Sequence, residues 1–174
     1  MIRSFFAAAL AVTLAFAPAA FAHDGKTHVG DLDISGMFAR ATLPNAPVGG
    51  GFLTITNHGA DADTLVSATS TVGKTVQVHE MKMEGDVMKM RHLSDGLPIP
   101  AGETVTLTPG GLHLMFIGLA QPFVEGETVP VTLTFATAGS IDLVLPVLSV
   151  AATGSADTSH QPMASGDAMN AAQH

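Results

Sequence analysis

The chain has 174 residues, a formal net charge of −8 at pH 7, 47% hydrophobic residues and no cysteine. The negative charge argues against nucleic acid or anionic lipid as a partner, because both bind basic surfaces. The lack of cysteine excludes disulfides, thiolate zinc sites, blue-copper centres with a cysteine ligand and thiol exchange. Nine methionines and eight histidines stand out in a chain without tryptophan or tyrosine, and they are the first indication of function.

The first 22 residues have the pattern of a signal peptide. A positive start at Arg3 precedes the apolar run 5–16 and the small-x-small sequence of residues 20–22. A membrane anchor needs about 20 apolar residues, so a retained anchor is the less favoured alternative. We expect cleavage after Ala22, export to the periplasm, and a mature protein without stable membrane insertion that begins at His23.

Residues 23–150 are predicted to form one all-β domain. Short runs rich in β-branched and apolar residues alternate with turn clusters of Gly, Pro, Asn and Asp, and no convincing amphipathic helix occurs. Alternation of apolar and polar residues from Val131 to Phe135 indicates one buried and one solvated face. This pattern favours an antiparallel Greek-key β-sandwich. The expected strands are 31–35, 51–57, 64–70, 74–79, 87–92, 104–108, 112–117, 128–135 and 140–147.

Residues 151–174 are rich in Ala, Ser, Gly and Asp and lack a long apolar run, so we expect a disordered tail. The tail nevertheless contains His160, Met163, Met169 and His174. Two interpretations stay open: a low-affinity Cu(II) collector, or a spacer without a metal function.

The segment from His79 to His92 is the centre of the functional argument. Gly85 between two acids predicts a hairpin turn. With side chains alternating along each strand, one face of the hairpin would display only histidine and methionine. The alternative is that the methionines fill a core, which is their commoner role, although the histidines on the same face weaken it. The predicted opposed pairs are Met83 with Met88, Met81 with Met90, and His79 with His92.

A second element follows a Pro-Gly-Gly turn. His113 and Met115 are two residues apart, so a strand would place both on one face with Leu114 on the other. The pattern is weak alone, but with the hairpin it is a candidate second half of a metal site. Thioether sulfur is a poor ligand for hard ions, so a set of two histidines and two methionines favours Cu(I).

These residues resemble the PCuAC family of periplasmic copper chaperones over residues 30–147. The similar segments are Ala39-Arg40-Ala41-Thr42, residues 51–57, His79-Glu80-Met81, Met88-Lys89-Met90-Arg91, Ile99-Pro100-Ala101-Gly102 and His113-Leu114-Met115. The resemblance implies a cupredoxin-like fold and a copper ligand set at His79, Met90, His113 and Met115. One departure is Met37-Phe38, where the family commonly has Pro-Trp, and it leaves the ligand set intact.

The resemblance also implies delivery of copper to the copper-A centre of cytochrome c oxidase, with the copper-bearing subunit or a Sco-type thiol protein as partner. The alternative is a periplasmic copper-sequestering or resistance protein that has no dedicated acceptor. An enzyme is not expected, because the sequence shows no Ser-His-Asp or paired-carboxylate arrangement and Glu80 should point away from the metal.

Four other histidines receive separate interpretations. The free amine and imidazole of His23 would form a chelating pair for Cu(II) after cleavage, a weaker candidate site. His28 and His58 are interpreted as ordinary loop residues. His92 is interpreted as exposed, and the alternative is that it supports a metal ligand.

Overall fold

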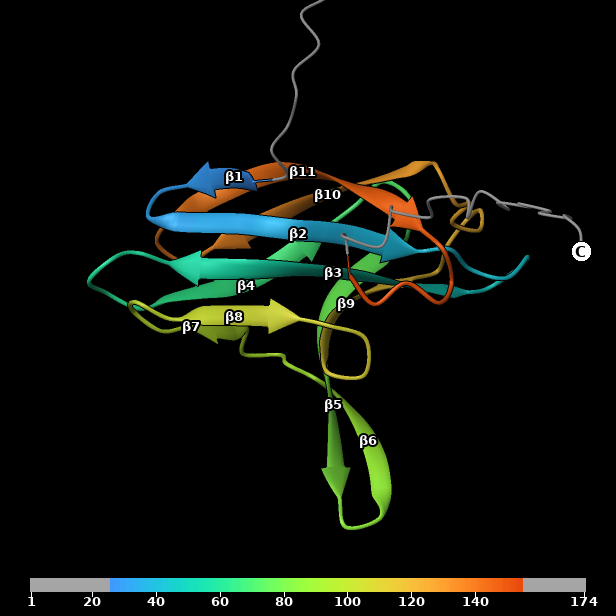
Figure 1. Ribbon diagram of the computed structural model, residues 1–174, viewed down its shortest axis with the longest axis horizontal. Coiled ribbons are helices and arrows are strands. Elements are labelled where there is room, and N and C mark those ends of the chain that lie inside the picture. Colours follow the sequence, from blue (N-terminus) through green and yellow to red (C-terminus); the bar gives the residue numbers. More distant parts are fainter. Residues whose placement is uncertain (1–25, 155–174) are drawn as a thin grey trace, which may run out of the picture.

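The computed structural model describes residues 26–154, and the regular structure of this part is entirely β-strand (Figure 1). Within it, no helix is long and apolar enough to cross a membrane. The predicted signal peptide, His23 and residues 155–174 of the predicted tail lie outside the described residues. The strands are β1 (Lys26–Val29), β2 (Leu32–Arg40), β3 (Val48–Asn57), β4 (Asp63–Thr69), β5 (Thr75–Glu84), β6 (Val87–His92), β7 (Leu97–Ile99), β8 (Thr104–Leu107), β9 (Leu112–Ile117), β10 (Thr128–Phe135) and β11 (Gly139–Leu148).

Each of the nine predicted strands is present: β6, β9 and β10 have the predicted bounds, and one or both ends of each of the other six are shifted by one to five residues. Two short strands were not predicted. β1 has a single apolar residue, Val29, and β7 is a three-residue strand with Pro98 at its centre. β1 lacks the apolar content on which strand prediction depends, and β7 is too short and contains a proline.

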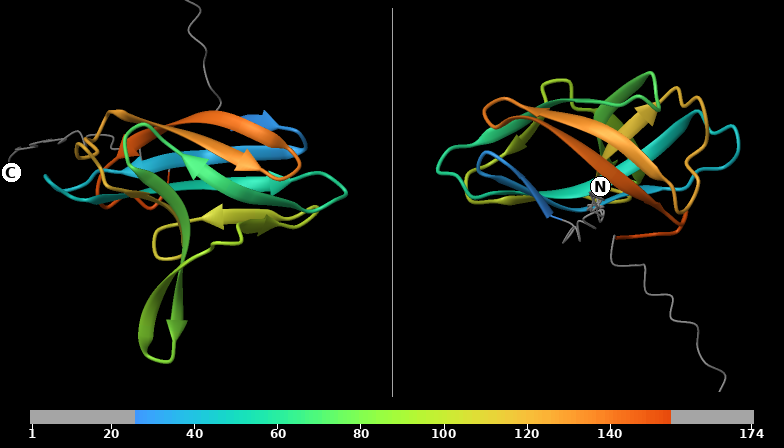
Figure 2. Two further views of the ribbon diagram at one scale, coloured as in Figure 1. Left: turned by 180° about the vertical axis from the view of Figure 1, so that it is seen from behind. Right: turned by 90° about the horizontal axis from the view of Figure 1, so that it is seen from above.

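The strands close into a flattened circuit. Its order is β2, β11, β10, β4, β5, β9 and β3, which pairs again with β2. Among the described strands, the pairing of β11 with β2 is the one that is parallel, and the others are antiparallel. The weakest pairing in the circuit is between β4 and β5, which are joined by the single residue pair Ala68↔Val76. The result is a cupredoxin-like β-sandwich, as predicted, with its strands around one interior (Figure 2).

The interior is filled by every second residue of each strand. In β10, Val129, Val131, Leu133 and Phe135 are buried while the residues between them face outward. The same alternation buries Val76 and Val78 of β5 and Leu114 and Phe116 of β9. Burial of this apolar surface is the main source of stability, at about 25 cal/mol per Å². It also forces the odd-numbered residues of β5 and β9 onto the outer face.

Strand β3 packs closely because it lacks side chains at one end. A Cβ at Gly51 would lie 2.9 Å from Phe116 Cε2 and 3.0 Å from Leu145 Cδ2, so a larger residue would displace the core. The preceding residue, Gly50, is on the opposite face of β3, faces outward and pairs with Met115 of β9. The glycines thus let β9 and its outward residues sit beside β3.

A small apolar cluster covers part of the outer face of β2 and β3. Phe38 and Phe52 are paired across the two strands with ring centroids 4.9 Å apart, and Ala152 is buried against them. The Arg40 Nε donates a hydrogen bond to the Ala152 carbonyl (2.6 Å). The packed part of the chain therefore includes Ala152, two residues beyond the predicted end of the domain at 150.

Asp63 connects the start of β4 to the turn between β10 and β11. Its buried carboxylate accepts hydrogen bonds from the backbone N–H groups of Thr64, Thr137 and Ala138 at 2.7–2.9 Å. Burial by itself would raise the pKa of Asp63, but these hydrogen bonds outweigh it and hold the pKa below its ordinary 3.8.

Replacing Asp63 by asparagine should lower the free energy of unfolding by about 1–3 kcal/mol at pH 7, because an amide cannot accept all three bonds as a carboxylate does. The lowered pKa means that the carboxylate stabilises the fold above about pH 4, and that this contribution is lost as the pH falls through the folded-state pKa. Urea unfolding at pH 7 and pH 3 should therefore show a smaller difference between parent and variant at pH 3. Asp86→Asn, at the exposed hairpin turn, is the control. Equal losses at both pH values would contradict this role of Asp63.

Candidate metal centre

The three histidines of the metal region lie in one row across three adjacent strands. His79 of β5 is directly opposite His92 of β6 on one side and His113 of β9 on the other. The ring centroid of His79 is 5.4 Å from that of His92 and 5.8 Å from that of His113. The hairpin register agrees with the predicted one at all three opposed pairs. The two sequence segments that were expected to share a site are therefore hydrogen-bonded neighbours on one face.

The two methionines assigned as ligands lie in the rows on either side of His79. Met90 pairs with Met81, one row toward the hairpin tip, and Met115 pairs with Gln77, one row in the other direction. Each is a diagonal neighbour of His79, and such neighbours have Cα atoms about 7–8 Å apart. Methionine has three rotatable bonds and spans such gaps readily. Convergence on one ion therefore requires both thioethers to swing toward His79.

One ring nitrogen of His79 is buried and has no hydrogen-bond partner. Its Nε2 is 2.8 Å from Gln77 Oε1, and because an amide oxygen can only accept, the Nε2–H is the donor. The proton is thus on Nε2, and Nδ1 carries a free lone pair. That Nδ1 is the one buried side-chain nitrogen or oxygen without a hydrogen-bond partner in the part of the chain that the structure describes. An unpaired buried acceptor costs stability, and a bound ion or a water molecule would remove that cost.

His113 is oriented in the same manner. Its Nδ1 donates a hydrogen bond to the Gly111 carbonyl (3.1 Å), which leaves Nε2 with the free lone pair. Metal-binding histidines usually donate their second N–H to a carbonyl or carboxylate, which fixes the ring and its tautomer. Gln77 therefore fixes the ring of His79, and the Gly111 carbonyl fixes the ring of His113, as such partners do in metal sites.

The electrostatic environment keeps His79 neutral. Burial of the ring, with the nearby His113 and His92, lowers the pKa of His79 below its ordinary value of 6.5. Neutral imidazole is the form that binds a metal ion, so this shift extends the pH range in which His79 is ready to bind.

Carboxylates are turned away from this face. Glu80 forms an ion pair with Arg91 (2.6 Å) on the other side of the hairpin, as its position in the sequence predicted. Among residues 26–154, no three His, Cys, Asp or Glu side chains are placed to hold a metal ion together. The soft side chains in the rows next to His79 and His113 are the methionines.

His28 and His58, interpreted from the sequence as ordinary loop residues, both contact the carboxylate of Asp33. His28 lies in β1 and not in a loop, and Asp33 bridges it to His58: the Asp33 carboxylate is 2.5 Å from His28 Nδ1 and 3.1 Å from His58 Nε2. The interpretation of His28 as a loop residue was wrong because β1 was not predicted. His92 is exposed, as expected.

Sequence reasoning did not include Gln77 in the site. The available signal was its spacing, since Gln77 is two residues before His79 on the same strand and so must share its face.

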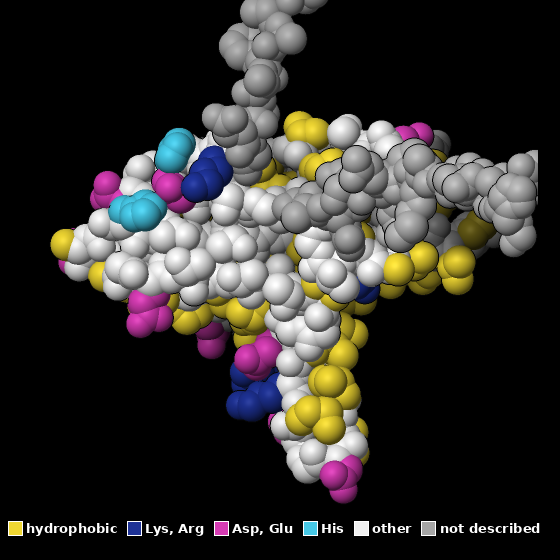
Figure 3. All heavy atoms as spheres, in the orientation of Figure 1, with side chains coloured by type: hydrophobic (Ala, Val, Ile, Leu, Met, Phe, Trp, Pro, Cys, Tyr) yellow, Lys and Arg dark blue, Asp and Glu magenta, His cyan; other side chains and the backbone are white. Residues whose placement is uncertain are grey.

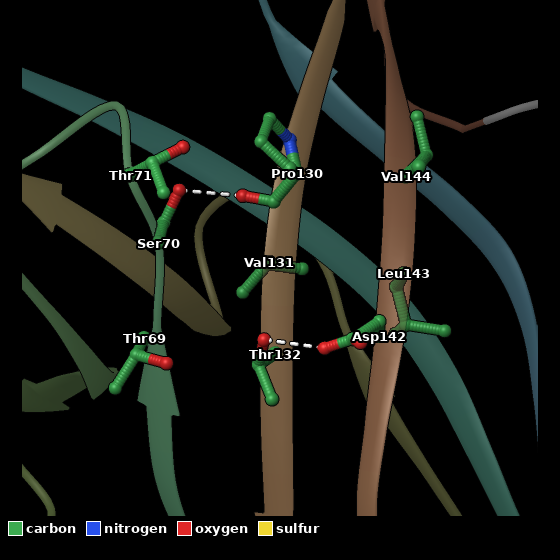
Figure 4. A pocket seen from close by; sticks show the side chains of 9 residues that line it. All are labelled: Thr69, Ser70, Thr71, Pro130, Val131, Thr132, Asp142, Leu143 and Val144. Atoms are coloured by element: carbon green, nitrogen blue, oxygen red, sulfur yellow. Dashed lines mark hydrogen bonds between the residues drawn. The ribbon is translucent and has the colours of Figure 1, made fainter.

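The shallow groove between the end of β4 and strands β10 and β11 has a different character (Figure 4). Ser70 Oγ donates to the Pro130 carbonyl (2.5 Å) and Thr132 Oγ1 donates to Asp142 Oδ1 (2.6 Å). No histidine or methionine lines it, so it offers no ligand for a soft metal.

Comparison with solved structures gives the fold. The chain is similar to the copper-bound PCuAC domain from PmoF2, with 22% identity and a TM-score of 0.61 over 71% of this chain and 97% of that domain. It is also similar to the Cu(I) form of DR1885 from Deinococcus radiodurans, with 26% identity and a TM-score of 0.55 over 73% of this chain and 83% of that one. The resemblance to PCuAC domains noted from the sequence is thus confirmed.

Comparison of sequences gives the family. A curated relative, "Putative lipoprotein Lxx21020" of Leifsonia xyli subsp. xyli (strain CTCB07), is 34% identical over 93 residues, which are 53% of this chain and 56% of the relative. The chain thus matches about half the length of that relative. The model of the family described as "Putative lipoprotein LpqE-like" matches residues 32–147, which include all four predicted ligands. With the fold of PCuAC domains and this match over most of its described residues, the chain belongs to the LpqE-like family.

Proposed function

We propose that this chain is an extracytoplasmic copper chaperone that binds one Cu(I) through His79, Met90, His113 and Met115. The observation that carries the proposal is the buried His79 Nδ1 without a hydrogen-bond partner, on a ring whose centroid lies 5.8 Å from that of His113. Similarity to a Cu(I)-bound protein of the same fold supports the metal. The relative named as a lipoprotein and the signal-like residues 1–22 support a location outside the cytoplasm, in the periplasm.

The proposed ligand set suits transfer better than storage. Two imidazoles and two thioethers are all neutral, and thioethers need no deprotonation before they bind. Both thioether groups lie near the ends of long, unbranched side chains, and Met90 is 51% exposed. An acceptor can therefore replace the thioethers first, while the two histidines hold the ion. No electron is exchanged in this sequence of steps.

The proposed recipient is the copper-A centre of cytochrome c oxidase, reached directly or with a Sco-type thiol protein. The alternative is a sequestering protein with the same site and no acceptor. Catalysis is not part of the proposal, and the nearest acid, Glu80, is paired with Arg91 on the opposite face.

Met90→Leu and Met115→Leu should each weaken Cu(I) binding by about 100-fold, since even residues that only orient a ligand cost about 10- to 100-fold when removed. The change in unfolding free energy should stay under about 1.5 kcal/mol, because the volumes are similar. Anaerobic competition titration gives the affinity, and X-ray absorption counts sulfur and nitrogen ligands. Met37→Leu, at a methionine packed on the core, is the matched control. Parent-like affinity in both variants would refute the ligand assignment.

The imidazole of His79 should titrate below pH 6.5 in the metal-free protein, as followed by its ring proton resonances in NMR. The unfolded chain takes up this proton near pH 6.5, whereas the folded chain does so only at lower pH. Neutral His79 therefore has no effect on stability above pH 6.5, and stability is lost as the pH falls from 6.5 through the folded-state pKa. A midpoint at or above 6.5 would show that burial and the two neighbouring histidines do not act as described.

Loaded with one Cu(I), the protein should transfer the ion to the separately purified, reduced copper-A domain of an oxidase. After mixing and separation, copper should be found on the acceptor, and the Met115→Leu variant, loaded to the same level, should give up its copper faster because one ligand is already missing. A sequestering protein would retain its copper in the presence of the acceptor. That result would favour the alternative function without changing the metal site.

A further inference from the structure

The hairpin of β5 and β6 extends beyond the body of the molecule as a two-stranded arm (Figures 1 and 2). The pairing of β5 with β9 ends at Glu80↔Leu112, and from Met81 onward β5 has β6 as its partner among the described strands. Gly85 turns the chain at the tip with a positive φ of 64°. Both faces of the arm are therefore accessible.

The two faces differ completely in chemistry. One carries charged residues, where Lys89 pairs with Glu84 (2.5 Å) and Arg91 with Glu80. The other carries methionine and histidine alone, in three successive rows: His79↔His92, Met81↔Met90 and Met83↔Met88. Figure 3 shows hydrophobic side chains along one side of the arm and charged ones along the other.

The methionine face is poorly explained as part of a core. Met83, Met88 and Met90 are 53%, 48% and 51% exposed. A merely apolar surface would be served as well by Leu, Val or Ile, yet the one aliphatic residue of the arm, Val87, is opposite Glu84 on the charged face. The shared property of the methionine face is the thioether, a soft ligand.

We infer that the tip of the arm is a second Cu(I) site, formed by the thioethers of Met81, Met83 and Met88 and distinct from the site at His79. Met83 and Met88 are directly opposite each other, where Cβ atoms are about 4.5–5.5 Å apart. Met81 is in the adjacent row on the same face. Each thioether can rotate about three bonds, so three sulfurs can surround one ion without a backbone change. Three neutral sulfurs suit Cu(I) and exclude hard cations.

The position of this site suggests its use as an entry point. Met90 lies opposite Met81 and diagonal to His79, so it is within reach of both ions. Copper can move from the tip to His79 by exchange of one thioether for another, with no change in oxidation state. This use as an entry point rests on the proposed function, whereas the tip site itself does not.

The test uses the full mature chain with 13C-labelled methionine methyl groups, titrated anaerobically with Cu(I). We expect the methyl resonances of Met81, Met83 and Met88 to shift together at a second equivalent, after those of Met90 and Met115. The double variant Met83→Leu/Met88→Leu should bind one fewer Cu(I) per chain while Met90 and Met115 still respond. Met37→Leu should bind as many ions as the parent. The parent titration needs no variant, so it decides the matter even if the double variant is unstable.

Three results would overturn the inference: no shift of Met83 and Met88 at two equivalents, unchanged stoichiometry in the double variant, or shifts that occur only with a copper-bridged dimer in size-exclusion chromatography. Met115→Leu separates this inference from the proposed function. If the tip methionines respond in that variant and in the parent, but Met90 responds in neither and Met115 does not respond in the parent, the proposed function fails and the tip site stands.

Discussion

Six opposed pairs join β5 to β9, from Thr75↔Ile117 to Glu80↔Leu112, and the metal face depends on their register. In this register Val78 and Leu114 point inward together while His79 and His113 point outward together. A slip by one residue would bury an imidazole in the core and expose a core residue. The apolar residues between the ligands are thus what holds the ligands in place, because the cost of exposing Val78 and Leu114 fixes which neighbours meet. Gly51 contributes from β3, since a side chain there would collide with Phe116 and press on β9.

Prediction from sequence succeeded where the determinants are local. The hairpin register followed from Gly85 and a period of two, and the outward position of His113 and Met115 followed from Leu114 between them. The all-β sandwich followed from the spacing of the turns. These features need only neighbouring residues and the geometry of a strand.

Prediction stopped where contacts are distant in the sequence. The residues near His79 do not indicate that β9, more than 30 positions later, is its neighbour. The family resemblance implied that the two segments share a ligand set, but not that their strands pair. β1 and β7 were missed because their stability comes from pairing with β2 and β4 and not from their own composition. The proton of His79 on Nε2 depends on Gln77, whose partner could be identified only once both side chains were placed.

The outer cluster of Phe38, Phe52 and Ala152 decides where the chain leaves the domain. Phe52 is two residues from Gly50 on β3, and Gly50 is opposite Met115, so Ala152 packs on the same outer face as His113 and Met115. The last described residues therefore lie on the face that carries the predicted metal ligands, and residues 155–174, with two histidines and two methionines, continue the sequence from there. Because the segment and the site belong to one chain, any contact between a donor atom of the segment and the site would be intramolecular and would not depend on the amount of protein in the compartment. Dilution would leave such a contact unaffected.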